Sequence, residues 1–550
     1  MRMTELLTTT ALQPQRTRRT DTARILTSGD VGKILPVKMI PIFREDAVQN
    51  GKVRLTVQLM ETAEMLANSV VLQAQAHFVP FLAFSQFNGI DSFNRSYMKE
   101  AEADGTTIPF FEKDKAWNGS SVVDVGAYDT STWDTVDGST GTATFYQTLG
   151  LHHAEADLNT SYVQAYNAVV NMRREARSKN LPTRNEFDHN LAEAFRLNLG
   201  FNDIVSDYDE KLVDGAVPLS GLTFKAPVMA EGYYNPTSTY RVPLQHSNAD
   251  TVSGAVKPDG STITAYSFDS IWAELSSGGS ASMSLNDIKM AEKIVQLARK
   301  RTEFDHLEDE HLIDLVMSGI GIPAENLKNP ILLASKQTPF QFVSRYATDA
   351  GNLDENVANG AASIDLTVRL PRTNIGGIIV VTCSAVPESI WERKEDHFLS
   401  TVDPDNLPMW MRDFADPNQI EVVKNGEIDV NHSTPDSTFG YRPLNSKWIN
   451  RDYTSVGGKY YRPADDAFTE VRSNIYSTEA TNPTLNADWY LCTNMHKKVF
   501  ADQVSDSMEI SCVTAMNITG HTVGGARLIE ATDDYDKIEA QIDQTRVETS

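Results

Sequence analysis

The sequence predicts a mainly β protein in which one β core carries helical insertions in the middle of the chain. Three observations predict this class. Strand-like segments crowd Ile34–Phe84, alternating segments return in the last third, and helical or polar segments lie between them. Length alone suggests about three or four domains, but one large β domain with long insertions breaks that estimate. Strands at both ends of the chain favour a single core.

Two of the early segments alternate with a period of two. Apolar and polar side chains take turns through Lys52–Met60 and Val70–Val79. Because successive side chains of a strand point to opposite faces, both segments are expected to have one buried face and one wetter face. The preceding segment, Ile34–Phe43, contains Pro36 and Pro41, which cannot donate to a ladder and which indicate an edge strand or a bulge.

The remaining elements follow from similar patterns. Alternation predicts strands over residues 364–370 and Ser507–Thr519, where Thr514 interrupts the apolar face, and the continuous apolar segment Ile378–Val386 predicts a strand buried on both faces. Apolar stripes, capping residues and helix stops predict four helices. These helices are Tyr162–Lys179, Glu186–Leu197, a helix capped by Ser284, and Asp309–Met317.

The chain divides into an arm, a domain and a tail. A Thr-rich, locally basic N-terminal arm over residues 1–28 is expected to be mobile. A single domain over residues 29–528 follows, with exposed loops at about 100–160 and 229–283 that are rich in Ser, Thr, Gly and Asp. Residues 529–550 form an acidic C-terminal tail.

Composition excludes several classes of protein. With 49 Lys and Arg against 74 Asp and Glu, the formal charge is −25, so the chain alone is a poor candidate for wrapping nucleic acid. The three cysteines are too few and too scattered for a disulfide framework or a zinc site. Neither a secretory signal nor a membrane span is recognisable, so we expect synthesis in the cytosol without membrane insertion.

Each segment that resembles a catalytic, metal-binding or cofactor-binding motif is better explained as a loop, a helix end or a chance match. The segment Gly319–Ala324 superficially matches a dinucleotide loop, but it follows a helix and carries a proline where the next helix would begin. The group His152, His153, Glu155 and Asp157 lacks the spacing of a metal site. Ser96 and Lys99 match SxxK without its companion motifs. We therefore predict no enzyme, no catalytic residue, no metal and no cofactor.

Several stretches, taken in order, resemble the major capsid protein of the Microviridae, the small tailless single-stranded DNA phages. The most specific is Phe439–Trp448 (FGYRPLNSKW), and the order of the matches from Gly29 to Thr519 carries the resemblance. The loops depart from the enterobacterial members, and the chain looks closer to divergent microviruses of marine or alphaproteobacterial hosts. The other matching stretches are Gly29–Gly32, His77–Pro80, Phe87–Tyr97, Tyr166-Asn167, Leu285–Arg301, Gly321–Pro330, Pro387-Glu388, Glu392-Arg393 and Asp416-Pro417.

The resemblance implies an eight-stranded antiparallel jelly-roll barrel with long inserted loops. Copies of the chain would close into a T=1 icosahedral shell around circular single-stranded DNA, as the capsid of a virion assembled in the cytoplasm of a bacterial host. A small basic DNA-binding protein would neutralise the DNA. Loop Tyr233–Ser282 or Trp117–Ala143 would protrude and meet a host surface receptor. The resemblance leaves internal scaffolding and pilot proteins open as further partners.

Two further hypotheses concern a DNA-facing site and an alternative function. The first is that Arg16, Arg18, Arg19 and Arg24 face the packaged DNA and help to neutralise it. The second is an alternative function, a β-sandwich protein that binds or acts on carbohydrate, whose exposed aromatic side chains would stack on sugars. Candidates for that stacking are Tyr233, Tyr234 and Trp272.

Overall fold

The structure, a computed structural model, divides the chain into two compact units. The first comprises Met1–Tyr208 and Phe304–Ser550, and the second comprises Asp209–Glu303. The described residues are 15–62, 64–102, 104–124, 144–151, 157–208, 228–235, 238–243, 270–273, 285–304, 310–321, 328–346, 356–415, 419–449, 455–461, 474–477, 482–525, 528 and 534–541. This part of the chain is mainly β, and its sheets are antiparallel, which confirms the predicted class.

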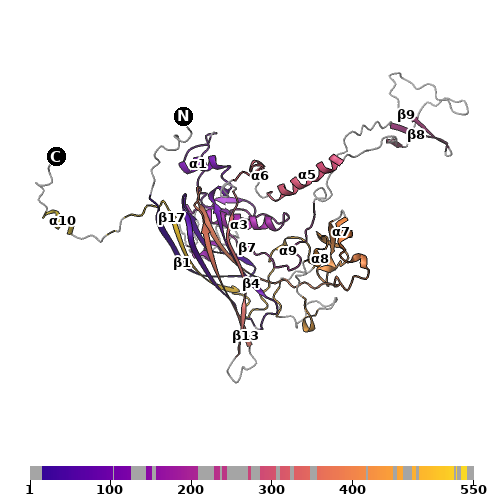
Figure 1. Cartoon of the computed structure of the whole chain (residues 1–550). Helices are drawn as coiled ribbons and strands as arrows, with labels where there is room; N and C mark the ends of the chain where they lie inside the picture. Colours follow the sequence, from indigo (N-terminus) through magenta and orange to yellow (C-terminus); the bar gives the residue numbers. More distant parts are fainter. Residues whose placement is uncertain are drawn as a thin grey trace, which may run out of the picture. The chain divides into compact units, whose positions relative to one another are not determined.

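Two five-stranded sheets form the centre of the first unit (Figure 1). The first sheet has the strand order β1 (Thr17–Gly29), β17 (Met508–Gly520), β3 (Ala47–Leu59), β13 (Asn356–Leu370) and β12 (Gln341–Tyr346). The second sheet has the order β11 (Ile331–Pro339), β4 (Val70–Pro80), β14 (Gly377–Pro387), β2 (Lys33–Ile42) and β7 (Ala192–Glu193).

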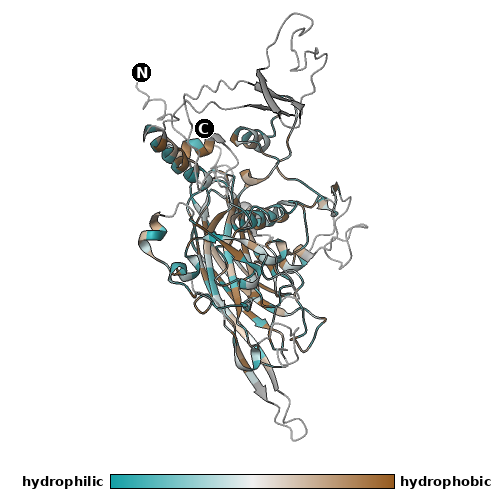
Figure 2. Ribbon diagram, turned by 90° about the vertical axis from the view of Figure 1, so that its right-hand side faces the viewer, coloured by the Kyte–Doolittle hydropathy of each residue, from teal (hydrophilic) through white to brown (hydrophobic). Residues whose placement is uncertain are grey.

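The inward faces of the two sheets share one hydrophobic core. Leu55 of β3 and Ile510 of β17 belong to the same buried cluster as Leu72 of β4 and Val381 of β14. The period-two alternation of the sequence places these side chains on one face of each strand. Figure 2 accordingly shows both hydrophobic and hydrophilic segments along the ribbons of the core. Thr514 interrupts the pattern on β17 and is buried, with its hydroxyl 3.5 Å from the carbonyl oxygen of Ala23.

The outward face of the second sheet is covered, unlike that of the first. Helix α3 (Ser161–Arg177) packs on it, and the Tyr166 hydroxyl donates to the Ile34 carbonyl at 2.7 Å and accepts from the Ala192 amide at 2.9 Å. Helices α1 (Ile90–Met98) and α2 (Thr144–Leu149) and the short strands β5 (Lys115–Trp117) and β6 (Val122–Asp124) belong to the same covering segment. All of β14 is therefore buried, which confirms the prediction for Ile378–Val386.

A third cluster of buried side chains surrounds Trp489. The Trp391 ring stacks on Trp489 at 5.3 Å between centroids, and Phe439 meets it edge-on at 4.9 Å. The surrounding elements are β15 (Ile420–Lys424), β16 (Thr438–Pro443), α7 (Trp410–Ala415), α8 (Ser446–Ile449) and α9 (Ala487–Tyr490). Elsewhere in the first unit lie α6 (Glu310–Met317) and α10 (Asp534–Glu539).

The second unit contains a small sheet and a helix. Strands β10 (Ser270–Ala273), β8 (Val228–Asn235) and β9 (Ser238–Pro243) pair in that order, and helix α5 spans Leu285–Thr302. The prediction of a loop over 229–283 is therefore wrong where these strands form. These strands could not be recognised in the sequence, because their composition is polar. Hairpin pairing depends on main-chain hydrogen bonds, which require no apolar pattern of side chains.

The N-terminal arm is also shorter than predicted. Strand β1 runs through Thr17–Gly29 and pairs along its length with β17, from Thr17 opposite Gly520 to Gly29 opposite Met508. Its residues alternate between half-buried and exposed, since β1 lies at the edge of its sheet. A strand with so little buried apolar surface resembles a polar tail in sequence. Residues 1–14 of the predicted arm lie outside the described residues.

Two further predictions need correction. No helix forms over Glu186–Leu197, a described segment where side chains alternate in burial from Ala192 to Leu197 and where β7 pairs with β2. The wetter face expected on β4 is largely buried, because His77 and Gln73 lie beneath the covering segment. The register shift beside Pro36 shows a bulge in β2, which is one of the two alternatives that its prolines left open.

Candidate nucleic-acid interface

Three of the four predicted arginines share an exposed surface at the first sheet. Arg18 and Arg24 lie on the exposed face of β1, six residues apart, and Arg16 is exposed just before that strand. Arg18 donates to the Asn517 side-chain oxygen on the neighbouring strand at 2.6 Å. Arg16 donates to the Glu45 carbonyl oxygen at 3.3 Å. The alternation of the strand therefore brings these side chains to one side of the sheet.

Arg19 lies on the opposite face of β1 and does not belong to this group. Its guanidinium pairs with the buried carboxylate of Asp46, donates to the Pro41 carbonyl oxygen at 3.1 Å, and lies 4.5 Å from the centre of the Phe43 ring. A carboxylate as buried as that of Asp46 needs such a charged partner. Arg19 therefore has a structural role within the sheet edge, whereas contact with DNA stays a prediction for Arg16, Arg18 and Arg24.

Strand pairing adds basic residues that sequence reasoning missed. Val513 of β17 lies opposite both Arg24 of β1 and Arg54 of β3, and Arg54 lies opposite Asp365 of β13. Lys52 lies two residues from Arg54 on the same exposed face. Arg369 is exposed farther along β13. Their polar alternation was visible in the sequence, but nothing there indicated that β1, β17, β3 and β13 are neighbours.

We call this surface the basic sheet face and define it by Arg18, Arg24, Lys52, Arg54 and Arg369. Among the described residues of the four strands, the exposed face also carries two carboxylates, those of Glu509 and Asp365. Basic groups thus outnumber acidic groups here, although the chain as a whole carries a formal charge of −25. A local field of this sign attracts polyanions to the face.

One ion pair on the basic sheet face is well defined. The Arg54 Nε donates to Asp365 Oδ1 at 2.7 Å, and this contact holds the pKa of the Asp365 carboxyl below its usual value, with a smaller contribution from Lys52. Arg24 and Arg369 have no hydrogen-bond or ion-pair partner within the part of the chain that the structure describes. Their charges are therefore available to an anion.

The rest of this face carries hydroxyl groups and two exposed apolar side chains, Leu26 and Val513. Hydroxyls of Thr20, Thr22, Thr56 and Thr367 lie between the basic residues, while the exposed positions of these four strands include no aromatic side chain among those described. Hydroxyl and guanidinium groups bind phosphate oxygens, which carry no sequence information. Aromatic platforms, which stack on bases, are the usual addition in proteins that grip single strands through their bases. The face is suited to the phosphate backbone.

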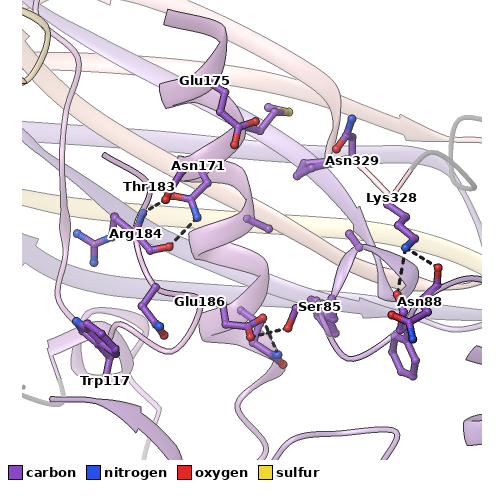
Figure 3. Close-up of a pocket in the computed structure, with 18 of the residues that line it drawn as sticks. Ser85, Asn88, Trp117, Asn171, Glu175, Thr183, Arg184, Glu186, Lys328 and Asn329 are labelled. Carbon is purple, nitrogen blue, oxygen red and sulfur yellow. Dashed lines mark hydrogen bonds between the residues drawn. The ribbon is translucent and has the colours of Figure 1, made fainter. Parts of the chain in front are cut away.

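A large polar pocket lies on the other side of the molecule, against α3. Its volume is about 1,010 Å³, and Figure 3 shows Trp117, Glu186, Ser85 and Lys328 around it. The Ser85 hydroxyl donates to Glu186 at 2.6 Å, and the Lys328 ammonium donates to the Asn88 carbonyl at 2.8 Å. These polar groups are thus already engaged with each other, and the pocket offers mainly a rim of hydrogen-bonding groups beside one indole ring.

No cluster of three or more His, Cys, Asp or Glu side chains in the described part of the chain is arranged to hold a metal ion. No described helix is long and apolar enough to cross a membrane. The side chains of Tyr233, Tyr234 and Trp272, the predicted sugar-stacking residues, lie outside those that the structure describes. No protein-family model and no curated protein matches this chain.

Proposed function

We propose that this chain is a major capsid protein of the Microviridae type, with a jelly-roll barrel at its centre. The strand order supports the barrel. If the eight long strands β1, β2, β3, β4, β11, β13, β14 and β17 are counted in chain order, the first sheet runs 1-8-3-6 and the second runs 2-7-4-5. This alternation between two sheets is the pattern of two Greek keys folded into a jelly roll. Strands β12 and β7 extend the edges.

The observation that carries the proposal is the different treatment of the two outer sheet faces. The second sheet is covered by α3 and its neighbours, whereas the first sheet exposes the basic sheet face on a strongly acidic chain. Jelly rolls serve many functions, so the barrel alone would not favour a capsid. A basic, hydroxyl-rich face whose described side chains include no aromatic ring is suited to lining a shell that holds nucleic acid by its phosphates.

The acidic charge of the rest of the chain implies that a second protein neutralises most of the DNA charge. A subunit with a formal charge of −25 cannot balance packaged DNA, so a small basic protein would supply most of the neutralising charge. The basic sheet face would hold only the outermost layer of a circular single-stranded genome. Many copies would form a T=1 icosahedral shell in the host cytoplasm. The second unit, or the segment at 117–143, would provide the protrusion toward a host receptor.

The proposal is tested first by looking for particles. The full chain is expressed alone and together with a small basic DNA-binding protein, and both samples are analysed by sedimentation and electron microscopy. We expect closed shells of one diameter in at least one sample. A stable monomer that instead binds or cleaves polysaccharide would favour the carbohydrate reading, and the pocket beside Trp117 would be the first place to map that binding.

The role of the basic sheet face is tested in the same particles. The triple variant R24E/K52E/R369E should assemble but package markedly less DNA per particle, because three attractive charges become repulsive. The matched control K289E/K293E/K300E changes the same charge at exposed positions of α5. If both variants package as much DNA as the wild type, the face does not contact the genome. Equal losses in both variants would mean that only net charge matters.

A further inference from the structure

A strongly exposed apolar surface lies around helix α7, and nothing in the capsid proposal so far accounts for it. Trp410 and Phe414 are each 76% exposed and stack on each other with ring centroids 5.4 Å apart. Leu399, Val402, Met409 and Met411 are also exposed. We call these six residues the aromatic knob. Single exposed apolar residues are ordinary, but a stacked and exposed aromatic pair with further exposed apolar residues close by in the sequence favours an interaction site.

The knob is held in place by its own polar contacts. The Asp413 carboxylate accepts from the Met409 amide at 2.9 Å and from the Asn445 side chain at 2.7 Å. Arg412 pairs with Asp413 at 3.3 Å and with Asp405 at 3.7 Å. These contacts cap and anchor a six-residue helix that would be too short to persist alone. The knob is thus presented in a defined shape, and three carboxylates, those of Asp403, Asp405 and Asp413, lie beside it against the one guanidinium of Arg412.

The same chain contains a matching depression at another place. A pocket of about 670 Å³ lies beside α1 and is lined by Phe43, Phe81, Tyr97, Phe110, Phe111 and Ile375. The two charged residues among those that line it, Arg44 and Lys99, are both cationic. Arg95 of α1 pairs with Asp91, and this contact raises the pKa of Arg95, with smaller contributions from Glu102 and Glu100. The pocket therefore offers aromatic walls and a basic rim.

We propose that the aromatic knob of one copy of this chain inserts into the α1 pocket of a second copy. The two surfaces share an apolar character, and the carboxylates beside the knob are opposite in charge to the two cationic residues that line the pocket. At about 150–250 Å² for each aromatic side chain, Trp410 and Phe414 alone would bury roughly 300–500 Å², a large part of the roughly 800 Å² that one partner contributes to a standard interface. Charge pairs at the rim set orientation more than affinity.

The arrangement also explains why the two surfaces differ. In Figure 1, α1 lies at the upper end of the two sheets, whereas α7 lies beside α8 and α9, so a contact between them would join two copies. A contact between unlike surfaces is head-to-tail, and it closes into rings when the rotation between copies allows it. The inference rests on the proposed function, because a shell needs such ring-forming contacts around its symmetry axes.

The contact is tested by cross-linking two singly substituted proteins. Cys383, Cys492 and Cys512 are buried, so introduced exposed cysteines will be the reactive thiols. Copies carrying Met411→Cys in the knob are mixed with copies carrying Thr107→Cys at the pocket and treated with copper phenanthroline, which oxidises two thiols to one disulfide. We expect a covalent dimer from the mixture. Val504→Cys, exposed outside the knob, replaces Met411→Cys in the control and should give none.

The outcomes separate this inference from the capsid proposal. Disulfides formed by Met411→Cys copies alone would indicate a knob-to-knob contact and overturn the inference. The double variant W410A/F414A should lose both the mixed cross-link and ring or shell formation, with unchanged thermal unfolding because both rings are exposed. If this variant still forms wild-type shells, the inference fails while the capsid proposal stands. If the mixed cross-link forms but no shell appears, the contact stands without the capsid.

Discussion

At the scale of single residues, burial decides the chemistry of the ionisable groups. His77 lies on β4 beneath the covering segment, and burial, aided by the charge of Arg173, lowers its pKa to about 4. Burial also lowers the pKa of His189 to about 4. Burial raises the pKa of Cys492 and Cys512 to about 12, so these thiols stay protonated. Such groups act as packing residues, in contrast to the exposed charges of the basic sheet face.

The histidines make stability depend on pH. Between pH 6.5 and 4, His77 is protonated in the unfolded chain but stays neutral in the folded chain. The free energy of unfolding therefore falls as the pH falls through this range. A shift of this size corresponds to roughly 3 kcal/mol at pH 4. The variant His77→Gln should therefore lose about 3 kcal/mol less than the wild type between pH 7 and pH 4, as measured by urea unfolding.

A neighbouring substitution separates protonation from packing. Gln75 lies on the same face of β4 as His77, and it does not titrate. The variant Gln75→Leu should keep the acid sensitivity of the wild type even if its absolute stability changes. Parallel pH profiles for the wild type and His77→Gln would contradict the assignment of this sensitivity to His77.

At the scale of elements, the close approach of neighbouring backbones restricts which residues the core strands can hold, as apolar packing also does. Gly377 opens β14 between Pro80 of β4 and Ile42 of β2. A Cβ atom at this position would overlap the carbonyl oxygen of Val79 and lie 2.8 Å from the ring of Phe78. The carbonyl belongs to the backbone of β4, so relief requires a shift of the central strands of the second sheet.

The variant Gly377→Ala should consequently lower the free energy of unfolding by about 2–3 kcal/mol, in the range of overpacked cores. The measurement is the urea midpoint at pH 7. Gly524→Ala is the matched control, because a Cβ atom there meets no neighbouring atom and the stability should change by less than about 0.5 kcal/mol. An unchanged midpoint for Gly377→Ala would show that β4 and β14 can separate at no cost.

At the scale of the whole molecule, net charge and local charge have opposite signs. Under the proposed function, the acidic chain would repel DNA at long range, whereas the basic sheet face would attract it at contact. Screening by salt weakens both effects, but contact with phosphates releases bound counterions and makes affinity fall with salt concentration. Binding to this face should therefore be weak, insensitive to base sequence and steeply dependent on salt.

The salt dependence can be measured on the purified subunit with labelled single-stranded DNA. If three to five phosphates are neutralised, the logarithm of the affinity should fall against the logarithm of salt concentration with a slope of about −2 to −3.5. The variant R24E/K52E/R369E should reduce the magnitude of this slope by about 2, while K289E/K293E/K300E should leave it unchanged. A strong preference for one base composition would contradict recognition through phosphates alone.

The sequence by itself determined the class of the protein and most of its core strands. Period-two alternation identifies β3, β13 and β17, and the continuous apolar segment identifies β14, because burial imposes those patterns on the side chains. It also determined which arginines were available, but not which of them act together. Arg18 and Arg19 are adjacent in sequence and lie on opposite faces of β1, where Arg19 pairs with Asp46.

Only the tertiary structure decided which strands are neighbours, and with them the basic sheet face, the α1 pocket and the aromatic knob. Arg24, Arg54 and Arg369 come from parts of the chain up to about 345 residues apart, and pairing through β17 and β3 brings them to one surface. Strand β1 escaped detection because an edge strand buries little apolar surface. Alternation reports which side of a strand is buried, whereas the partner of a strand depends on long-range hydrogen bonds that leave no local signal.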